Sequence, residues 1–265
     1  MSADDILIED RDGSVARLTM NRPAARNSLS LEMIGRIHQA IIDLGASRDV
    51  HAIVLAGNGP AYCAGHDLKE LTSARQHPDK GLAFYRETMG SCSRLMLSIG
   101  DCPKPVIAAV RGTATAAGCQ LVASCDLAVA TSDAQFATPG VNIGLFCSTP
   151  MVALSRNVSR KKAMEMLLTG EMIDADNALQ AGLINRIVEP EALEQTTLAL
   201  ATRIARKAPA TIRVGKNAFY RQASMSVSEA YDYTAEVMVQ NMMEPDAEEG
   251  IGAFIEKRPP SWRSL

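Results

Sequence analysis

The sequence predicts an α/β fold built from stacked β-β-α units, followed by a helical C-terminal region. Strand-like apolar runs alternate with amphipathic segments as far as about residue 190, and such alternation is typical of α/β proteins rather than all-α or all-β proteins. After Pro190 the strand-like runs stop and amphipathic segments follow one another. We therefore expect a ββα core over residues 1–190 and a helical oligomerisation region over residues 191–265, with no low-complexity linker between them.

The first expected elements are a β-hairpin and a helix. The strand-like segments ILIED and SVARLTM flank Asp12-Gly13, a pair that favours a tight hairpin turn. Asn21-Arg22-Pro23 then interrupts the pattern. Ser30 is a suitable N-cap for LEMIGRIHQAIIDLGA, in which apolar residues recur at helical spacing.

The middle of the chain alternates in the same way. Short continuous apolar runs such as HAIVLAG and PVIAAV indicate buried strands. The expected elements are, in order, a strand at 51–57, a helix at 79–100, a strand at 105–110, a turn of small residues followed by a short buried helix within 111–126, and a strand at 127–131.

Composition excludes several classes of protein. The chain has 265 residues, 47% of them hydrophobic, a net charge of −3 and a pI of about 5.9. This argues against a nucleic-acid-binding protein, which usually has a basic face. No apolar run reaches the ~18 residues of a membrane span. The N-terminus MSADDILIED lacks the basic-then-apolar pattern of a secretory signal, so we expect a cytoplasmic protein.

Common cofactor and nucleophile motifs are also missing. The six cysteines form no CxxC pair, which favours buried reduced thiols over a metal site. Gly57 and Gly59 follow a strand, but Tyr62 stands where a dinucleotide fingerprint needs glycine. No G-x-S-x-G nucleophile elbow occurs.

Two stretches share one design, IVLAGNGPAYCAGHDLKE and VIAAVRGTATAAGCQL. In each, a buried strand leads through small residues into a polar or helical start. Small residues let a ligand approach the backbone, and N–H groups at a helix start carry a partial positive charge. Two such groups aimed at one point would stabilise an oxyanion. Tight packing of strand against helix would give the same pattern, so both interpretations stay open.

Several motifs resemble those of the crotonase (enoyl-CoA hydratase/isomerase) superfamily. They are MNRPAARNSLS, AGHDLKE, VRGTATAAGCQLVASCDLAVA, FATPGVNIGL and AFIEKRPPSW, and they follow the family's order over nearly the whole chain. The resemblance implies a crotonase-type spiral of ββα units, a homotrimer or dimer of trimers, and a role in fatty-acid or related acyl-CoA metabolism. It also implies an acyl-CoA thioester substrate and no separate cofactor, because coenzyme A arrives as part of the substrate.

Carried over residue by residue, the resemblance assigns the oxyanion hole to the backbone N–H groups of His66, after Ala64-Gly65, and of Ala117, before Gly118. The positions of the two hydratase glutamates are occupied by Gln120 and Gly140, and an isomerase acid falls near Ser148. An amide does not accept a proton near neutral pH. Since each acid–base group contributes about 10²–10⁴-fold, hydratase activity is doubtful.

The resemblance also implies contacts to the coenzyme A moiety. Cations are expected from Arg22, Arg26 and Lys69, and from Lys257 near the C-terminus. The adenine pocket is expected to use backbone of Ala24 to Arg26 and of Asp67-Leu68.

Other side chains leave alternatives open. The His66 imidazole is either a base or, as we favour, a solvated group at the pocket rim. Cys147 is either a nucleophile or, as we favour, a buried thiol, and Asp126 is expected to organise backbone. The activities that remain open are thioester hydrolysis or decarboxylation, acyl-CoA binding without catalysis, and hydration through substitute groups.

Overall fold

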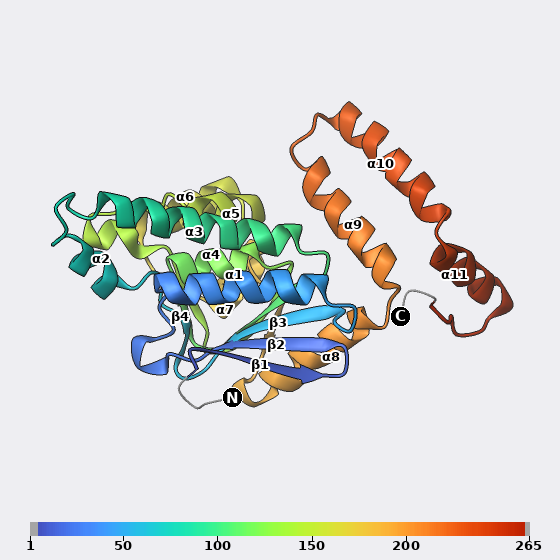
Figure 1. Cartoon of the computed structure of the whole chain (residues 1–265), viewed down its shortest axis with the longest axis horizontal. Helices are drawn as coiled ribbons and strands as arrows, with labels where there is room; N and C mark the ends of the chain where they lie inside the picture. The colour runs from blue at the N-terminus through green and yellow to red at the C-terminus, as the bar shows by residue number, and fades with distance from the viewer. Residues whose placement is uncertain (1–4, 263–265) are drawn as a thin grey trace.

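Two sheets form the scaffold of the protein, for which the computed structural model describes residues 5–262 (Figure 1). A six-stranded sheet has the order β1-β2-β3-β5-β7-β10, and a four-stranded sheet the order β4-β6-β8-β9. All pairs are parallel except β1–β2 and β8–β9. The strands are β1 Leu7–Asp12, β2 Val15–Met20, β3 Ala52–Gly57, β4 Ala61–Cys63, β5 Val106–Val110, β6 Thr113–Thr115, β7 Leu127–Thr131, β8 Gln135–Ala137, β9 Ile173–Asp174 and β10 Arg186–Val188.

Helices lie between successive pairs of strands along the chain. They are α1 Leu31–Ala46, α2 Leu68–Ala74, α3 Leu82–Asp101, α4 Ala117–Ser124, α5 Pro150–Asn157, α6 Arg160–Thr169, α7 Ala175–Ala181, α8 Leu193–Ala205, α9 Pro209–Gln222, α10 Val227–Met242 and α11 Pro245–Glu256. Three successive strand pairs, β3–β4, β5–β6 and β7–β8, each give one strand to the large sheet and the next to the small sheet. The predicted fold of stacked ββα units with a helical C-terminal region is thereby confirmed.

The large sheet is buried on both faces. Along β3, Ile53 and Leu55 pack into the core beneath α1, α3 and α4, whereas Val54 packs on the other face with Leu200 and Ala201 of α8. Successive strand side chains alternate between faces, and a parallel sheet covered on both sides reads as a continuous apolar run. This explains why the sequence of β3 contains no polar residue.

The N-terminal predictions agree closely with the structure. β1 and β2 form the expected hairpin, and Gly13 in its turn has φ of +56°. Ser30 caps α1, its hydroxyl accepting a hydrogen bond from Met33 N at 3.1 Å. The stretch after Arg111 differs from expectation, because the predicted turn contains β6. A strand of three residues is too short to produce a periodic signal.

The region after residue 190 has two parts. α8 packs on the large sheet and belongs to its core, whereas α9, α10 and α11 form an arm that stands away from the body (Figure 1). α10 has no buried residue in the single chain. Large apolar side chains such as Tyr231, Met242 and Phe254 are exposed along this arm. The boundary at residue 190 and the trimer stay predictions. Among residues 5–262, none of the helices combines the length and the apolar character that a membrane span needs.

A buried ion pair fastens the arm to the body. Lys216 of α9 donates to Asp126 Oδ2 at 2.6 Å and to the carbonyls of Ile99 and Lys104, both at 2.9 Å. Asp126 also accepts hydrogen bonds from Val106 N at 2.7 Å and from the Tyr220 hydroxyl at 2.8 Å. The expectation that Asp126 organises backbone is therefore confirmed.

We predict that Lys216→Met destabilises the protein by about 3–5 kcal/mol, because it leaves a partly buried carboxylate without its cation. Urea unfolding followed by circular dichroism measures the free energy. Lys207→Met removes an exposed lysine just before the same helix and serves as the control. Equal stability of the two variants would show that the pair does not fasten the arm.

Candidate functional site

The two small-residue turns, distant in sequence, touch in the structure. The Thr115 hydroxyl donates to the carbonyl of Ala64 at 3.1 Å. A side-chain carbon added to Gly65, whose φ is +94°, would lie 2.9 Å from Ala116 Cβ and 3.3 Å from Ala117 N. The reason is topological, since β4 and β6 are neighbours in the small sheet and each turn leaves the end of its strand.

The peptide of His66 is held with its N–H unpaired. Leu29 N donates to the carbonyl of Gly65 at 2.7 Å, and Asp67 N donates to the carbonyl of Leu29 at 3.1 Å. In a parallel bridge of this kind, the residue between the two bonds turns its own N–H and C=O to the opposite side. The turn before α4 packs against the neighbouring Gly65, and within residues 5–262 the His66 N–H has no acceptor.

Ala117 presents the second N–H. It is the first residue of α4, where N–H groups have no acceptor within the helix. The turn before it is strained, because Ala116 has φ of +50° and ψ of −118°, a region that L-residues avoid at a cost of about 1–3 kcal/mol. The positive φ falls on Ala116 and not on Ala117, so an alanine at 117 is compatible with this geometry.

Gln120 lies on the same face of α4, one turn after Ala117. Its side chain is 4% exposed, and its Oε1 has no hydrogen-bond partner within residues 5–262. Long helical side chains lean toward the helix N-terminus, which directs this amide toward the two N–H groups. The buried Thr138 hydroxyl, just after β8, likewise lacks a partner within the described chain. Both groups can hydrogen-bond, and neither is a base near neutral pH.

Gly140 does not leave room for a side chain. An added Cβ would lie 2.7 Å from the Leu145 carbonyl oxygen and 2.9 Å from Cys147 Sγ. Gly140 N donates to this sulfur at 3.3 Å. The position that the resemblance assigns to a second acid is therefore closed by the loop that follows it. Ser148, near the expected isomerase position, is exposed, and its N–H bonds the Phe146 carbonyl at 2.7 Å.

The imidazole of His66 is more buried than expected. Both ring nitrogens are enclosed, and neither has a hydrogen-bond partner within residues 5–262. Burial lowers the pKa of His66. The nearby backbone of Leu29 raises this pKa, although it forms no well-aligned hydrogen bond with the ring, and the effect of burial is the larger of the two. The ring nitrogens are therefore not solvated as expected, although the residue as a whole is half-buried. Desolvation favours the neutral ring.

The cysteines are structural. All six are free and buried. Burial raises the pKa of Cys147, and it raises the pKa of Cys119 to about 12. A thiol with a raised pKa is a poor nucleophile, which agrees with the expectation of buried reduced thiols.

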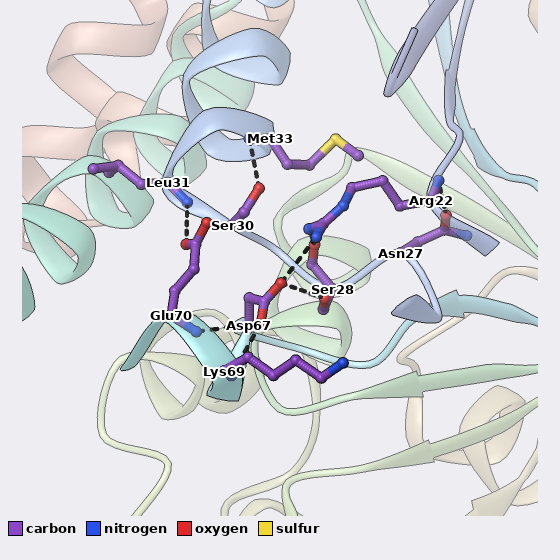
Figure 2. Close-up of polar contacts among 9 residues, drawn as sticks. All are labelled: Arg22, Asn27, Ser28, Ser30, Leu31, Met33, Asp67, Lys69 and Glu70. Carbon is purple, nitrogen blue, oxygen red and sulfur yellow. Dashed lines mark hydrogen bonds and ion pairs between the residues drawn. The ribbon is translucent and has the colours of Figure 1, made fainter. Parts of the chain in front are cut away.

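The expected coenzyme A ligands divide into three groups. Arg22 is an internal cation, because it binds Asp67 Oδ2 at 3.0 Å and the Ser28 carbonyl at 3.0 Å (Figure 2). Burial alone would raise the pKa of Asp67, but hydrogen bonds from Arg22 and from two backbone N–H groups lower it. The exposed residues nearby are Ala24, Arg26, Leu68 and Lys69. Lys257 ends α11, at the opposite end of the molecule from α2 (Figure 1).

The structure also contains a cavity away from the predicted site. A cavity of about 600 Å³ lies between the large sheet and the start of α8, and Arg17, Arg111 and Glu194 are among its lining residues. None of the predicted site residues lines it.

Within residues 5–262 no group of three His, Cys, Asp or Glu side chains could hold a metal ion.

Known proteins resemble this chain over almost its full length. A family model described as enoyl-CoA hydratase/isomerase matches residues 10–264. Enoyl-CoA hydratase domain-containing protein 3, mitochondrial, of Danio rerio is 46% identical over 264 residues, covering 99% of this chain and 90% of that protein. A crystal structure of an enoyl-CoA hydratase of Mycobacterium smegmatis has a TM-score of 0.93 at 50% identity and covers 98% of this chain and 99% of its own. The crystal structure of human enoyl-CoA hydratase domain-containing protein 3 has a TM-score of 0.93 at 43% identity, with coverages of 97% and 100%. The resemblance inferred from the motifs is confirmed.

The same comparison corrects the expected location. The Danio rerio relative is named as mitochondrial, and this contradicts the expectation of a cytoplasmic protein. The N-terminal composition addressed only a secretory signal, and import into organelles uses segments of a different, amphipathic pattern.

We predict that Gly140→Glu destabilises the protein by about 1–3 kcal/mol, as overpacking does, because its Cβ meets a backbone oxygen. Thermal unfolding measures this. Gly35→Glu, where an added Cβ has no atom within 4 Å, is the matched control. A Gly140→Glu protein as stable as the control would show that the loop yields freely.

We predict that His66 makes stability fall with acidification. Its folded pKa is lowered from 6.5, so below about pH 7 the unfolded chain binds the proton first and the folded state is disfavoured. The free energy of unfolding should decrease by at most about 1.4 kcal/mol per pH unit until the folded pKa is passed. Urea titrations from pH 7.5 to 5 test this. His66→Gln should remove that part of the slope, with His77→Gln, at an exposed position, as the control. An unchanged slope in His66→Gln contradicts the assignment.

Proposed function

Because the chain belongs to the enoyl-CoA hydratase/isomerase family, we propose that it binds acyl-CoA thioesters, with the thioester oxygen between the N–H groups of His66 and Ala117. The observation that carries the proposal is the packing of the two turns that hold these groups. Each lacks an acceptor within the described chain, and each comes from a turn packed against the other.

These donors are suited to a developing negative charge. Backbone N–H groups held rigidly need no reorganisation when charge appears on the oxygen. The eight-residue helix α4 begins at Ala117, and the positive end of its dipole adds to the attraction. The proposed contacts for the phosphates are two exposed cations: Arg26, whose carbonyl accepts from Ala64 N, and Lys69, three residues after His66. The proposal needs no cofactor beyond the coenzyme A that the substrate carries.

Hydration is not the chemistry that these side chains support. Adding water to an enoyl thioester requires a base for the water and an acid for the α carbon. Gln120 supplies an amide, and the Gly140 position is closed by Leu145 and Cys147. We therefore propose an acyl-CoA-binding protein with little or no hydratase activity.

Decarboxylation is a second candidate, favoured by an oxyanion hole without acids. In an acyl thioester that carries a carboxylate on its α carbon, the bond from that carbon to the carboxylate breaks. Its electron pair moves into the thioester, carbon dioxide leaves, and the enolate oxygen is stabilised by the two N–H groups. A proton from water then adds to the α carbon. No base is needed to start this step, which is why Gln120 does not prevent it.

We also propose a homotrimer or a dimer of trimers. The support is the row of exposed apolar side chains on α10 and α11, such as Met238, Met242 and Phe254, since large exposed apolar patches mark interaction surfaces. We propose in addition a role in fatty-acid or related acyl-CoA metabolism, which membership of the enoyl-CoA hydratase/isomerase family supports.

We predict binding of acyl-CoA thioesters without ordinary hydration. Calorimetry should detect crotonyl-CoA and other acyl-CoAs, while the loss of enoyl absorbance should be at least about 10²-fold slower than with a family hydratase that has both glutamates. Gly65→Ala, which places a Cβ against Ala116, should weaken thioester binding. Gly13→Ala, also at positive φ but with open space, should not. Absence of binding to every thioester contradicts the proposal, and hydration at ordinary rates would show that other groups replace the acids.

A further inference from the structure

A polar cluster surrounds Asp67, the residue that follows His66 (Figure 2). The Asp67 carboxylate is its centre. Oδ2 accepts from Arg22 at 3.0 Å and from the Ser28 hydroxyl at 3.3 Å, and Oδ1 accepts from Lys69 N at 3.0 Å and Glu70 N at 3.5 Å. One side chain thus ties the segment 22–28 to the first turn of α2.

The same segment is fixed to the body from its other side. Asn27 is fully buried, and its side-chain amide donates to the carbonyls of Asn58 at 2.9 Å and Ala61 at 2.8 Å. Its Oδ1 accepts from Arg22 N at 2.9 Å. Ala64 N donates to the carbonyl of Arg26 at 3.0 Å. The segment 22–28 is therefore a rigid support against which the chain after β4 rests.

The His66 peptide spans the gap between these anchors. On its N-terminal side Gly65 is bonded through its carbonyl to Leu29 N, and on its C-terminal side Asp67 is bonded through both its backbone N–H and its side chain. Rotation of the peptide between Gly65 and His66 would turn the N–H away from the start of α4. The bond of the Gly65 carbonyl to Leu29 N opposes this rotation directly, because that carbonyl belongs to the same planar peptide. The contacts of the Asp67 side chain to Arg22 and Ser28 oppose it from the other end of this short segment.

We propose that Asp67, through its contacts with Arg22 and Ser28, is the positioning residue that aims the His66 N–H at the thioester oxygen. This inference rests on the proposed function, and it assigns Arg22 to the support of the site instead of to a phosphate. Asp67 touches no substrate atom in this role and acts through the backbone. A donor misplaced by ~1 Å loses much of its effect, so the carboxylate matters for the acyl end of the ligand and not for its nucleotide end.

The test uses the full chain and two probes. The first is 4-dimethylaminocinnamoyl-CoA, a conjugated thioester whose absorbance shifts to longer wavelength when its carbonyl is polarised. The second is coenzyme A without an acyl group, which has no thioester oxygen. Calorimetry gives the affinity for each probe, and absorbance spectra give the polarisation.

Asp67→Asn keeps the shape of the side chain and the cap of α2 but removes the charge that holds Arg22. We expect this variant to lose most of the spectral shift and to bind the thioester about 10-fold more weakly, with affinity for coenzyme A within about two-fold of the parent. Arg22→Met should reproduce these effects, and Arg22→Lys should restore part of the shift. The double variant should be no worse than either single variant, because the two act as one unit.

Two further variants keep the result interpretable. Asp174→Asn makes the same change at a different aspartate N-cap, which accepts from Asn177 N at 2.8 Å at the start of α7, and should match the parent in every readout. Ser28→Ala removes one contact to Asp67 without changing charge, and it carries the test if Asp67→Asn does not fold. We expect a smaller loss of the shift in Ser28→Ala.

The outcomes separate the two proposals. A parent that binds the thioester without any spectral shift contradicts the oxyanion hole, and with it the role of Asp67. A parent with a clear shift that persists in Asp67→Asn and Ser28→Ala overturns the positioning role alone. Equal loss of affinity for both probes would overturn it as well, because it would indicate a general disturbance of the binding surface.

Discussion

The contact of α4 with β4 constrains the rest of the site. A side-chain carbon at Gly118 would lie 2.0 Å from the carbonyl oxygen of Cys63, so α4 can start where it does only because residue 118 has none. This approach brings the N-terminus of α4 beside the turn that leaves β4. The unpaired N–H groups, the strain at Ala116 and the burial of Gln120 all follow from that one packing constraint. The sequence interpretations of ligand approach and of tight packing are therefore not alternatives here, since the same glycine serves both.

Much of the fold could be predicted from local signals. The hairpin at Asp12-Gly13, the cap at Ser30 and the buried strand β5 each have a signature in neighbouring residues. The small sheet had none, because β4, β6 and β8 are three-residue strands whose stability comes from pairing with segments about 20–50 residues away. Their existence depends on the stacking of successive turns, and no local pattern contains that information.

The candidate site, like the fold, could be predicted from the sequence only in part. Small residues and motif order predict backbone donors at His66 and Ala117, and the structure shows that the two turns holding them are packed together. The sequence could not show that Arg22 is neutralised by Asp67, since a cation after a strand looks the same whether it faces solvent or a carboxylate 45 residues later. Nor could it show that Gly140 is closed by Cys147 and the Leu145 carbonyl. The space that a side chain at position 140 would need is already filled by these atoms.

The groups around the proposed thioester site carry no formal charge, and this affects whether binding there would be coupled to proton uptake or release. The two proposed donors are peptide groups, Gln120 is an amide, and burial lowers the pKa of His66, which favours the uncharged ring. Binding of a thioester oxygen at the proposed site would therefore not require any of these groups to take up or release a proton. We expect the heat of that binding to be independent of the ionisation enthalpy of the buffer.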